Sequence, residues 1–311
     1  MSKPVKLTIN EIMERNMKLL IFFFLISMCV LGQENNKILE QDAVVEKLAD
    51  GFRFTEGPAV DPEGNIYFTD QPDDRIFKWS VEEGKLSVFH ENAGRANGLY
   101  FDKQGYLLSC SDMNNEIRQI DMNGNHAVLV ADFDGKRLNG PNDLWVDPAG
   151  GIYFTDPLYK RDYWTRSPEM QQDGEHVYYL SPVTKKLIRV TTDLEKPNGI
   201  IGAPDGKSLY VADIKAGKTY SYEIQPDGTL TNKKLFAAMG SDGMTIDREG
   251  NIYLTGKGVT VFNTQGEQIA HIPVEAGWTA NVCFGGKDMK TLFITASENL
   301  YSLKMNVAGN K

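Results

Sequence analysis

The chain has 311 residues, 41% of them hydrophobic, and a formal net charge of −9 at pH 7. A nucleic-acid surface would need a Lys/Arg-rich stripe, which the sequence lacks, so no nucleic-acid partner is expected. The length would allow two ordinary domains, but all-β propellers and barrels often exceed roughly 200 residues as one domain. We therefore predict one domain over residues 43–305, preceded by a separate N-terminal segment.

Residues 1–32 are predicted to be an N-terminal extension followed by a signal peptide. One lysine precedes an apolar run over residues 19–31, and Gly32 supplies a small residue at the cleavage point. A membrane anchor is the alternative, but the run is shorter than the ~20 apolar residues that a transmembrane helix needs. We expect export, with a bacterial periplasm as the location, and no stable membrane insertion after cleavage.

The main part of the chain repeats a short strand-like motif six times. The copies read IYFTD, LLSCSD, IYFTD, LYVAD, IYLTG and LFITA, and they begin at Ile66, Leu107, Ile152, Leu209, Ile252 and Leu292. Their first residues are 41, 45, 57, 43 and 40 positions apart, a period typical of propeller blades. Each repeat divides into four short strands joined by turn residues. This pattern predicts an all-β fold, a six-bladed β-propeller with four-stranded blades.

The sixth repeat supplies only three strands before the repeats end. The segment at residues 43–49, AVVEKLA, stands before the first repeat and is not needed to complete it. We predict that this N-terminal strand becomes the fourth strand of the last blade. The ring would then close by shared strands and leave no open edge between first and last blades.

One structural position, just before the first strand of each repeat, carries an oxygen-bearing side chain in five repeats. Counting back ten residues from the strand motif, or eleven in the fourth repeat, gives Glu56, Asn97, Asn142, Asn198 and Asp242. The same count gives Val282 in the sixth repeat, with Asn281 beside it. Turn capping by Asn and Asp explains one such position better than five aligned ones. Because first strands line a propeller's central channel, we expect these side chains to converge at the axis.

Four of these residues, Glu56, Asn142, Asn198 and Asp242, combine two carboxylates with two amide oxygens. Oxygen ligands without His or Cys select a hard cation, so Ca²⁺ is predicted first, with Mg²⁺, Mn²⁺ or Zn²⁺ as alternatives. Two carboxylates neutralise a dication, and four protein ligands leave Ca²⁺ with positions for water or substrate. The aspartates that end two of the strand motifs, Asp70 and Asp156, are predicted to stabilise turns instead.

The loop after the second strand of the third repeat, residues 157–175, is long and accounts for the spacing of 57. Its aromatic side chains are large and amphipathic, which suits a lid over a site at the channel mouth. We predict that Tyr159 and Trp164 contact a substrate there, together with Asn97 and Asn142. The alternative is a flap that only packs over the blade edge.

Five segments, in order over about residues 50–300, resemble a known family. They read FTEGPAVDPEGNIYFTD, GKRLNGPNDLWVDPAGGIYFTDP, KPNGI, SDGMTID and CFGG. They are similar to the gluconolactonase and senescence marker protein (regucalcin) family of calcium-dependent six-bladed propellers, and above all to its bacterial gluconolactonase-like branch. The resemblance implies that Glu56, Asn198 and Asp242 ligate a divalent cation. It also implies that Asn142 is a further ligand or substrate contact and that Asp242 is the catalytic general acid/base.

The function that this resemblance implies is a calcium-dependent lactonase acting on a small sugar lactone or related cyclic ester. The cation would polarise the lactone carbonyl. Asp242 would take a proton from the attacking water or only orient it. Two alternatives stay open, a phosphotriesterase-like hydrolase on the same site and a non-enzymatic binding propeller with a structural calcium. In animal members an arginine lies two residues before the position matched by Asn142, whereas this chain has Gly140.

Overall fold

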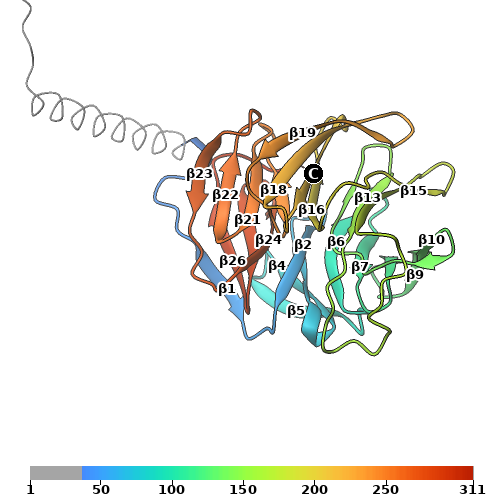
Figure 1. Cartoon of the computed structure of the whole chain (residues 1–311). Helices are drawn as coiled ribbons and strands as arrows, with labels where there is room; N and C mark the ends of the chain where they lie inside the picture. Colours follow the sequence, from blue (N-terminus) through green and yellow to red (C-terminus); the bar gives the residue numbers. More distant parts are fainter. Residues whose placement is uncertain (1–36, 311) are drawn as a thin grey trace, which may run out of the picture.

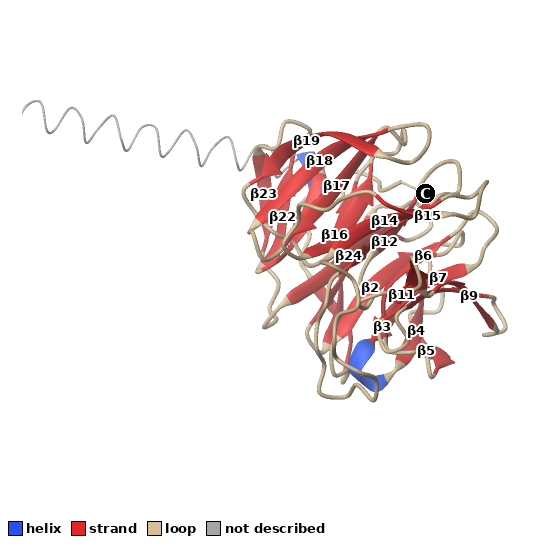
Figure 2. Ribbon diagram, turned by 45° about the vertical axis from the view of Figure 1, so that its right-hand side comes forward, coloured by secondary structure: helices blue, strands red, loops and turns tan. Residues whose placement is uncertain are grey.

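The regular structure of residues 37–310 is almost entirely β-strand (Figure 2). A computed structural model describes residues 37–310, which form six four-stranded antiparallel sheets arranged as propeller blades (Figure 1). The segment predicted to be an extension and signal peptide lies outside these described residues. Within residues 37–310, no helix has the length and apolar character needed to cross a membrane.

Five blades use four strands that follow one another in the chain, with the innermost strand first. The first contains β2 (Thr55–Val60), β3 (Ile66–Asp70), β4 (Arg75–Ser80) and β5 (Lys85–Glu91). The second contains β6 (Ala96–Phe101), β7 (Leu107–Ser111), β8 (Glu116–Ile120) and β9 (His126–Val130). The third contains β12 (Leu144–Val146), β13 (Ile152–Asp156), β14 (His176–Leu180) and β15 (Leu187–Arg189). A two-stranded hairpin of β10 (Asp132–Phe133) and β11 (Lys136–Arg137) connects the second blade to the third.

The next two blades repeat the same order. The fourth contains β16 (Pro197–Gly202), β17 (Ser208–Asp213), β18 (Lys218–Ile224) and β19 (Leu230–Ala237). The fifth contains β20 (Met244–Ile246), β21 (Ile252–Gly256), β22 (Gly258–Phe262) and β23 (Gln268–Ile272). In each blade the predicted strand motif is the second strand.

The sixth blade is completed by a strand from the other end of the chain. It contains β24 (Thr279–Gly285), β25 (Thr291–Ala296), β26 (Asn299–Lys304) and, as its outer strand, β1 (Glu46–Asp50). β1 pairs antiparallel with β26, from Glu46 opposite Ser302 to Asp50 opposite Asn299. Figure 1 shows blue β1 beside red β26. The six-bladed fold and its closure by an N-terminal strand are thereby confirmed, and β26 is not left as an open edge.

The second strands form the apolar layers between blades. All five residues of β3 and of β13, both IYFTD, are buried. The aromatic pair in the middle of each motif is at most 1% exposed and packs against a neighbouring blade. Burying one such side chain contributes about 2 kcal/mol, so the motif recurs because each copy meets neighbours of the same kind.

The aspartate that ends the second strand holds the segment in front of the first strand. Asp156 accepts backbone N–H bonds from Asn139 at 2.9 Å and Gly140 at 2.8 Å. Asp70 accepts two bonds of the same kind from the segment before β2, at 2.9 and 3.1 Å. These two aspartates thus have a structural role, but they hold a segment 16 or 17 residues earlier in the chain and not the local turn that was predicted. Each pair of bonds fixes the backbone two residues before a predicted site residue, which is Asn142 in the third blade.

Candidate functional site

The predicted ring of oxygen-bearing side chains lies at irregular positions of the inner strands. The ladder shifts register at Asn97 in β6, at Asn198 in β16 and directly after Glu56 in β2, and at each shift two consecutive residues face one residue of the second strand. Such a bulge re-aims a side chain that would otherwise follow the ladder. In the third and fifth blades the corresponding residues, Asn142 and Asp242, lie two positions before the regular strand. Asp242 is partly exposed, whereas the other four are at most 5% exposed.

The sixth blade departs from the expected count, so Val282 is a wrong assignment. The register shift in β24 lies between Thr279 and Asn281, which puts Ala280 at the ring position. The carbonyl of Ala280 accepts a hydrogen bond from the second-strand residue Thr255 of the fifth blade at 2.8 Å. The carbonyl of Asn97 accepts the equivalent bond from the first blade at 3.0 Å. The sixth blade therefore contributes no side-chain oxygen to the ring.

The residues that directly follow the ring residues in the chain form a second layer. A Cβ on Gly57, at φ 39°, would lie 2.1 Å from the carbonyl oxygen of Asn97, so neighbouring blades approach too closely for any other residue. In the same layer the third and sixth blades carry Asp143 and Asn281, whose side chains lie 3.5 Å apart at Asp143 Oδ2 and Asn281 Nδ2. Burial raises the pKa of Asp143 to about 7.

Asp242 is held by hydrogen bonds to both carboxylate oxygens. Asn198 Nδ2 donates to Oδ1 at 2.8 Å, and Trp278 Nε1 donates to Oδ2 at 2.6 Å. Asn198 Nδ2 also donates to the hydroxyl of Tyr159 at 2.8 Å, which brings the lid to the ring. The sequence indicates that Trp278, just before the inner strand of the last blade, lies near the mouth of the channel and could shape the pocket. Its bond to Asp242 could not be predicted.

Glu56 and Asp242 are close enough to influence each other's ionisation. Burial raises the pKa of Glu56 well above its usual range, and the neighbouring charge of Asp242 raises it further. Burial also raises the pKa of Asp242, against the lowering effect of its bonds from Trp278 and Asn198. The positive charge of Arg161 lowers the pKa of both carboxylates. Two acidic groups, Glu56 buried and Asp242 partly exposed, therefore lie close together, and a cation between them would stabilise their charged forms.

The oxygen atoms of the ring fit a hard divalent cation as ligands. Asn198 Oδ1 is buried and has no hydrogen-bond partner, which is costly unless another group binds it. With Asn198 Nδ2 turned to Asp242 and Tyr159, this oxygen is available as a ligand. Within residues 37–310 no three His, Cys, Asp or Glu side chains gather as a metal cluster. A site here would therefore need the amide oxygens of Asn142 and Asn198 beside the two carboxylates.

The lid, residues 157–175, is fastened to the second and third blades. Trp164 Nε1 donates to Asp112 Oδ2 at 2.9 Å. The guanidinium of Arg166 stacks 3.4 Å over the Trp164 ring and donates to the carbonyl of Asn139 at 2.7 Å. The structure thus brings Tyr159 to the ring, while the polar contact of Trp164 is with the second blade.

This anchoring explains Gly140. A Cβ at this position, where φ is 155°, would lie 2.6 Å from Asp112 Oδ1 and 3.1 Å from Arg166 Nη2. The space beside Gly140 is therefore occupied by a lid arginine and its carboxylate partner, and a side chain at position 140 would displace them.

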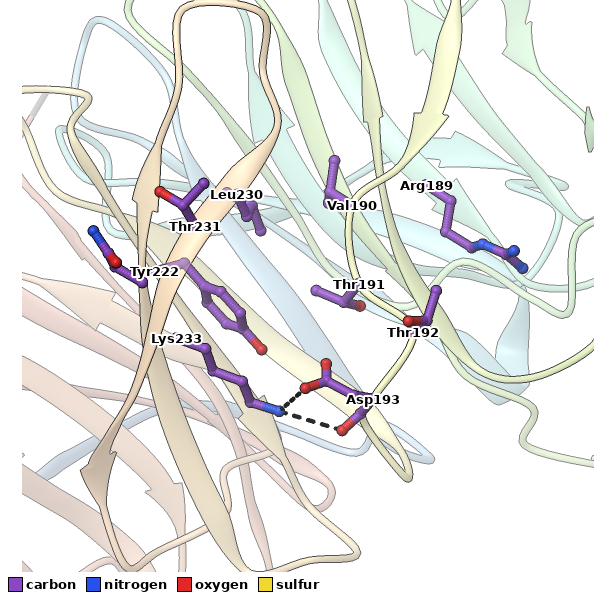
Figure 3. A pocket seen from close by; sticks show the side chains of 10 residues that line it. Arg189, Val190, Thr191, Thr192, Asp193, Tyr222, Leu230, Thr231 and Lys233 are labelled. Atoms are coloured by element: carbon purple, nitrogen blue, oxygen red, sulfur yellow. Dashed lines mark hydrogen bonds and ion pairs between the residues drawn. The ribbon is translucent and has the colours of Figure 1, made fainter.

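A separate cavity of about 310 Å³ lies between the third and fourth blades, away from the ring (Figure 3). Its walls come from residues 189–193 and from strands β18 and β19. Lys233 crosses it and binds the side chain of Asp193 at 2.7 Å. This cavity contains none of the predicted site residues, and we do not place the chemistry there.

Fold and geometry together define a class of protein, a six-bladed β-propeller with a candidate site of carboxylates and amides that a tyrosine of the lid contacts. Residues 54–298 match the family described as SMP-30/Gluconolactonase/LRE-like region, and the chain belongs to this family. It is 29% identical to the gluconolactonase of Zymomonas mobilis subsp. mobilis over 302 residues, covering 88% of this chain and 84% of that protein.

Two further relatives bear on the site. The solved structure of a gluconolactonase from Xanthomonas campestris is 31% identical, with a TM-score of 0.80, and the match covers 87% of this chain and 91% of that one. The diisopropyl-fluorophosphatase of Loligo vulgaris is 27% identical over 285 residues, covering 81% of this chain and 88% of that protein.

Proposed function

We propose that the protein is a lactone hydrolase of the gluconolactonase type that depends on a divalent cation, with Ca²⁺ as the first candidate. Glu56, Asn142, Asn198 and Asp242 would hold the cation. The observation that carries the proposal is the buried, unpartnered Oδ1 of Asn198, which lies in the same ring as two carboxylates. The named relatives support lactone hydrolysis, and a small sugar lactone is the substrate class we propose.

A cation in this ring would act as a Lewis acid on the lactone carbonyl. The residues of the chain supply the other requirements. Asp242 is the group that takes a proton from the attacking water, or orients that water, and the bonds from Trp278 and Asn198 fix its carboxylate plane. These bonds also lower its pKa, whereas burial raises it, so the two effects oppose each other.

The lid would bind the substrate and limit access of bulk water. Tyr159 presents its hydroxyl beside Asn198, where it can contact a polar group of the lactone. Asn97, in β6, and Asn142, two residues before β12, would contact hydroxyl groups of a sugar ring. The anchoring of Trp164 on Asp112 keeps the loop in this position.

The decisive experiment is hydrolysis of D-glucono-1,5-lactone by the purified, chelator-treated protein, followed by acid release. We expect activity only after Ca²⁺ or another divalent cation is restored, and we expect Asp242→Asn to abolish it with the cation present. Full activity with chelator would contradict the role of the cation. A parallel assay with a fluorophosphate ester tests the second candidate function, which the fluorophosphatase relative favours.

We also propose that the protein acts after export, with a bacterial periplasm as its location, because residues 19–31 have the pattern of a signal peptide. Cell fractionation with N-terminal sequencing of the mature protein tests this. Recovery of an uncleaved chain in the cytosol would contradict it.

A further inference from the structure

The two arginines of the lid are held differently. The guanidinium of Arg166 donates to the carbonyl of Asn139 and lies 3.5 Å from Asp112. Arg161 has its Nε buried without a hydrogen-bond partner, and its guanidinium carbon lies 5.0 Å from the centre of the Tyr159 ring. Arg166 therefore fastens the lid, whereas the donors of Arg161 are not used for that purpose.

Arg161 lies beside the lid residue that contacts the ring of oxygen-bearing side chains. The Tyr159 ring below it carries the hydroxyl that accepts the hydrogen bond of Asn198, and Asn198 also binds Asp242. A positive charge of the lid therefore lies beside the tyrosine that joins the lid to the acidic site.

The charges of the site leave Arg161 without a counterion once a dication is bound. Glu56 and Asp242 together balance two positive charges. The single carboxylate of Asp112 lies near both lid arginines and is paired with Arg166, so it balances only one of them. A guanidinium that is partly buried, with unused donors and no counterion, favours an anionic or strongly polar oxygen. Lactone hydrolysis generates such a group. Water adds at the acyl carbon, the acyl–oxygen bond breaks, the ring oxygen takes a proton, and the new carboxylic acid ionises.

We propose that Arg161 is a substrate-binding residue that binds the acyl oxygens of the reacting group, first the lactone carbonyl and then the product carboxylate. This inference rests on the proposed lactone hydrolysis for its reaction. Arg161 should also affect the affinity for the cation, because its positive charge and the bound cation would repel each other. Removing the charge of Arg161 should therefore strengthen cation binding while it weakens catalysis. A merely structural role would not move these two quantities in opposite directions.

The test compares Arg161→Gln with Lys160→Gln, which removes the same charge one residue away from an exposed side chain. Calorimetric titration with Ca²⁺ should show tighter binding in Arg161→Gln, by about tenfold, and an unchanged affinity in Lys160→Gln. In the Ca²⁺-loaded proteins, kcat/KM for D-glucono-1,5-lactone should fall at least about tenfold in Arg161→Gln. Inhibition by gluconate should weaken in the same variant, and Arg161→Lys should restore part of both effects.

The proposal is overturned if Arg161→Gln binds Ca²⁺ no more tightly than the wild type and keeps wild-type inhibition by gluconate. Thermal melting of each variant identifies a folding defect, and Arg161→Lys then supplies the comparison. A failure of the proposed function would give a different set of results. If the wild type hydrolyses no lactone, yet Arg161→Gln still tightens Ca²⁺ binding and weakens gluconate binding, the position of Arg161 stands and the reaction is wrong.

Discussion

The indole Nε1 of Trp278 donates a hydrogen bond to Oδ2 of Asp242 at 2.6 Å, across the boundary between the fifth and sixth blades. Asn198 of the fourth blade donates to the other oxygen, so three blades fix one carboxylate. A carboxylate held at both oxygens loses little conformational freedom when it acts on a water or a cation. The rigidity of the propeller is thereby transmitted to the group proposed to take the proton.

Trp278→Phe tests this relationship, because it keeps an aromatic ring and removes the donor. A hydrogen bond to a charged group contributes about 1.5–3 kcal/mol, so kcat/KM on the lactone substrate should fall roughly tenfold to a hundredfold. The melting temperature should change little, since the ring still packs. Trp79→Phe, the same change in β4, is the control. Wild-type kinetics in Trp278→Phe would show that Asp242 needs no fixed orientation.

The carboxylates of the ring should determine cation affinity. Glu56→Gln removes one negative charge from the proposed ligand set, and Ca²⁺ affinity should fall by about tenfold or more in calorimetric titration of chelator-treated protein. The control is Glu63→Gln, which removes the same charge from an exposed turn of the first blade. Equal affinities in the two variants would remove Glu56 from the ligand set.

The repeat explains why the ring could be predicted from the sequence. In four of the repeats the ring residue lies ten positions before the IYFTD-like motif, so counting alone aligned residues such as Glu56, Asn97 and Asn142. The count failed in the sixth blade because the hairpin between β24 and β25 is one residue pair longer. There Gly285 pairs with Thr291, and Leu292 faces Phe284. Hairpin length depends on the turn and on the strand pairing, and counting at one fixed spacing does not take either into account.

The contacts made by side chains from outside the repeat could not be predicted. Trp278 and Arg161 lie at non-repeated positions, so no alignment between blades gave them a partner. The lid was predicted from its length and its aromatic residues, but nothing in the sequence distinguishes the tyrosine that reaches the ring from the tryptophan that binds Asp112. That distinction depends on the path of the loop, and Arg166 fixes this path by its bond to Asn139.

The shared strand of the last blade gives a prediction about folding. Deleting residues 1–50 removes β1 and leaves β26 as an unpaired edge, whereas deleting residues 1–36 keeps every described strand. We expect the longer deletion to lose soluble protein that melts cooperatively, and the shorter one to keep it. A protein without residues 1–50 that melts as sharply and as high as the shorter deletion would show that β1 is not needed for closure.

The stability of the fold should depend on pH through Asp156. Burial raises the pKa of Asp156 to about 7, from an ordinary value near 3.9 in the unfolded chain. Between these values the folded state binds more protons than the unfolded state. The contribution of Asp156 is therefore fully present below about pH 4 and is lost as the pH rises through about 7.

Asp156→Asn removes this titration and keeps an oxygen that accepts from the backbone at 139–140. Urea unfolding at pH 5 and pH 8 should show that the wild type loses stability relative to the variant as the pH rises, by on the order of 1–3 kcal/mol. Parallel pH profiles for the two proteins would contradict a raised pKa at Asp156.

The lid gives the last prediction and separates an enzyme from a binding module. Trp164→Ala removes both the bond to Asp112 and the ring on which Arg166 stacks, so the loop should lose its anchor. A lost aromatic contact costs on the order of 1–3 kcal/mol, or roughly tenfold to a hundredfold in kcat/KM. Ca²⁺ affinity should be preserved, because the polar contact of Trp164 is with the second blade and not with the ring. Trp164→Phe, which keeps a ring for Arg166 and loses only the donor, should show a smaller effect.

Wild-type kinetics in Trp164→Ala on every lactone that the parent hydrolyses would make the loop a packing element. A Ca²⁺-loaded parent protein that hydrolyses neither lactones nor phosphoesters would favour the binding propeller.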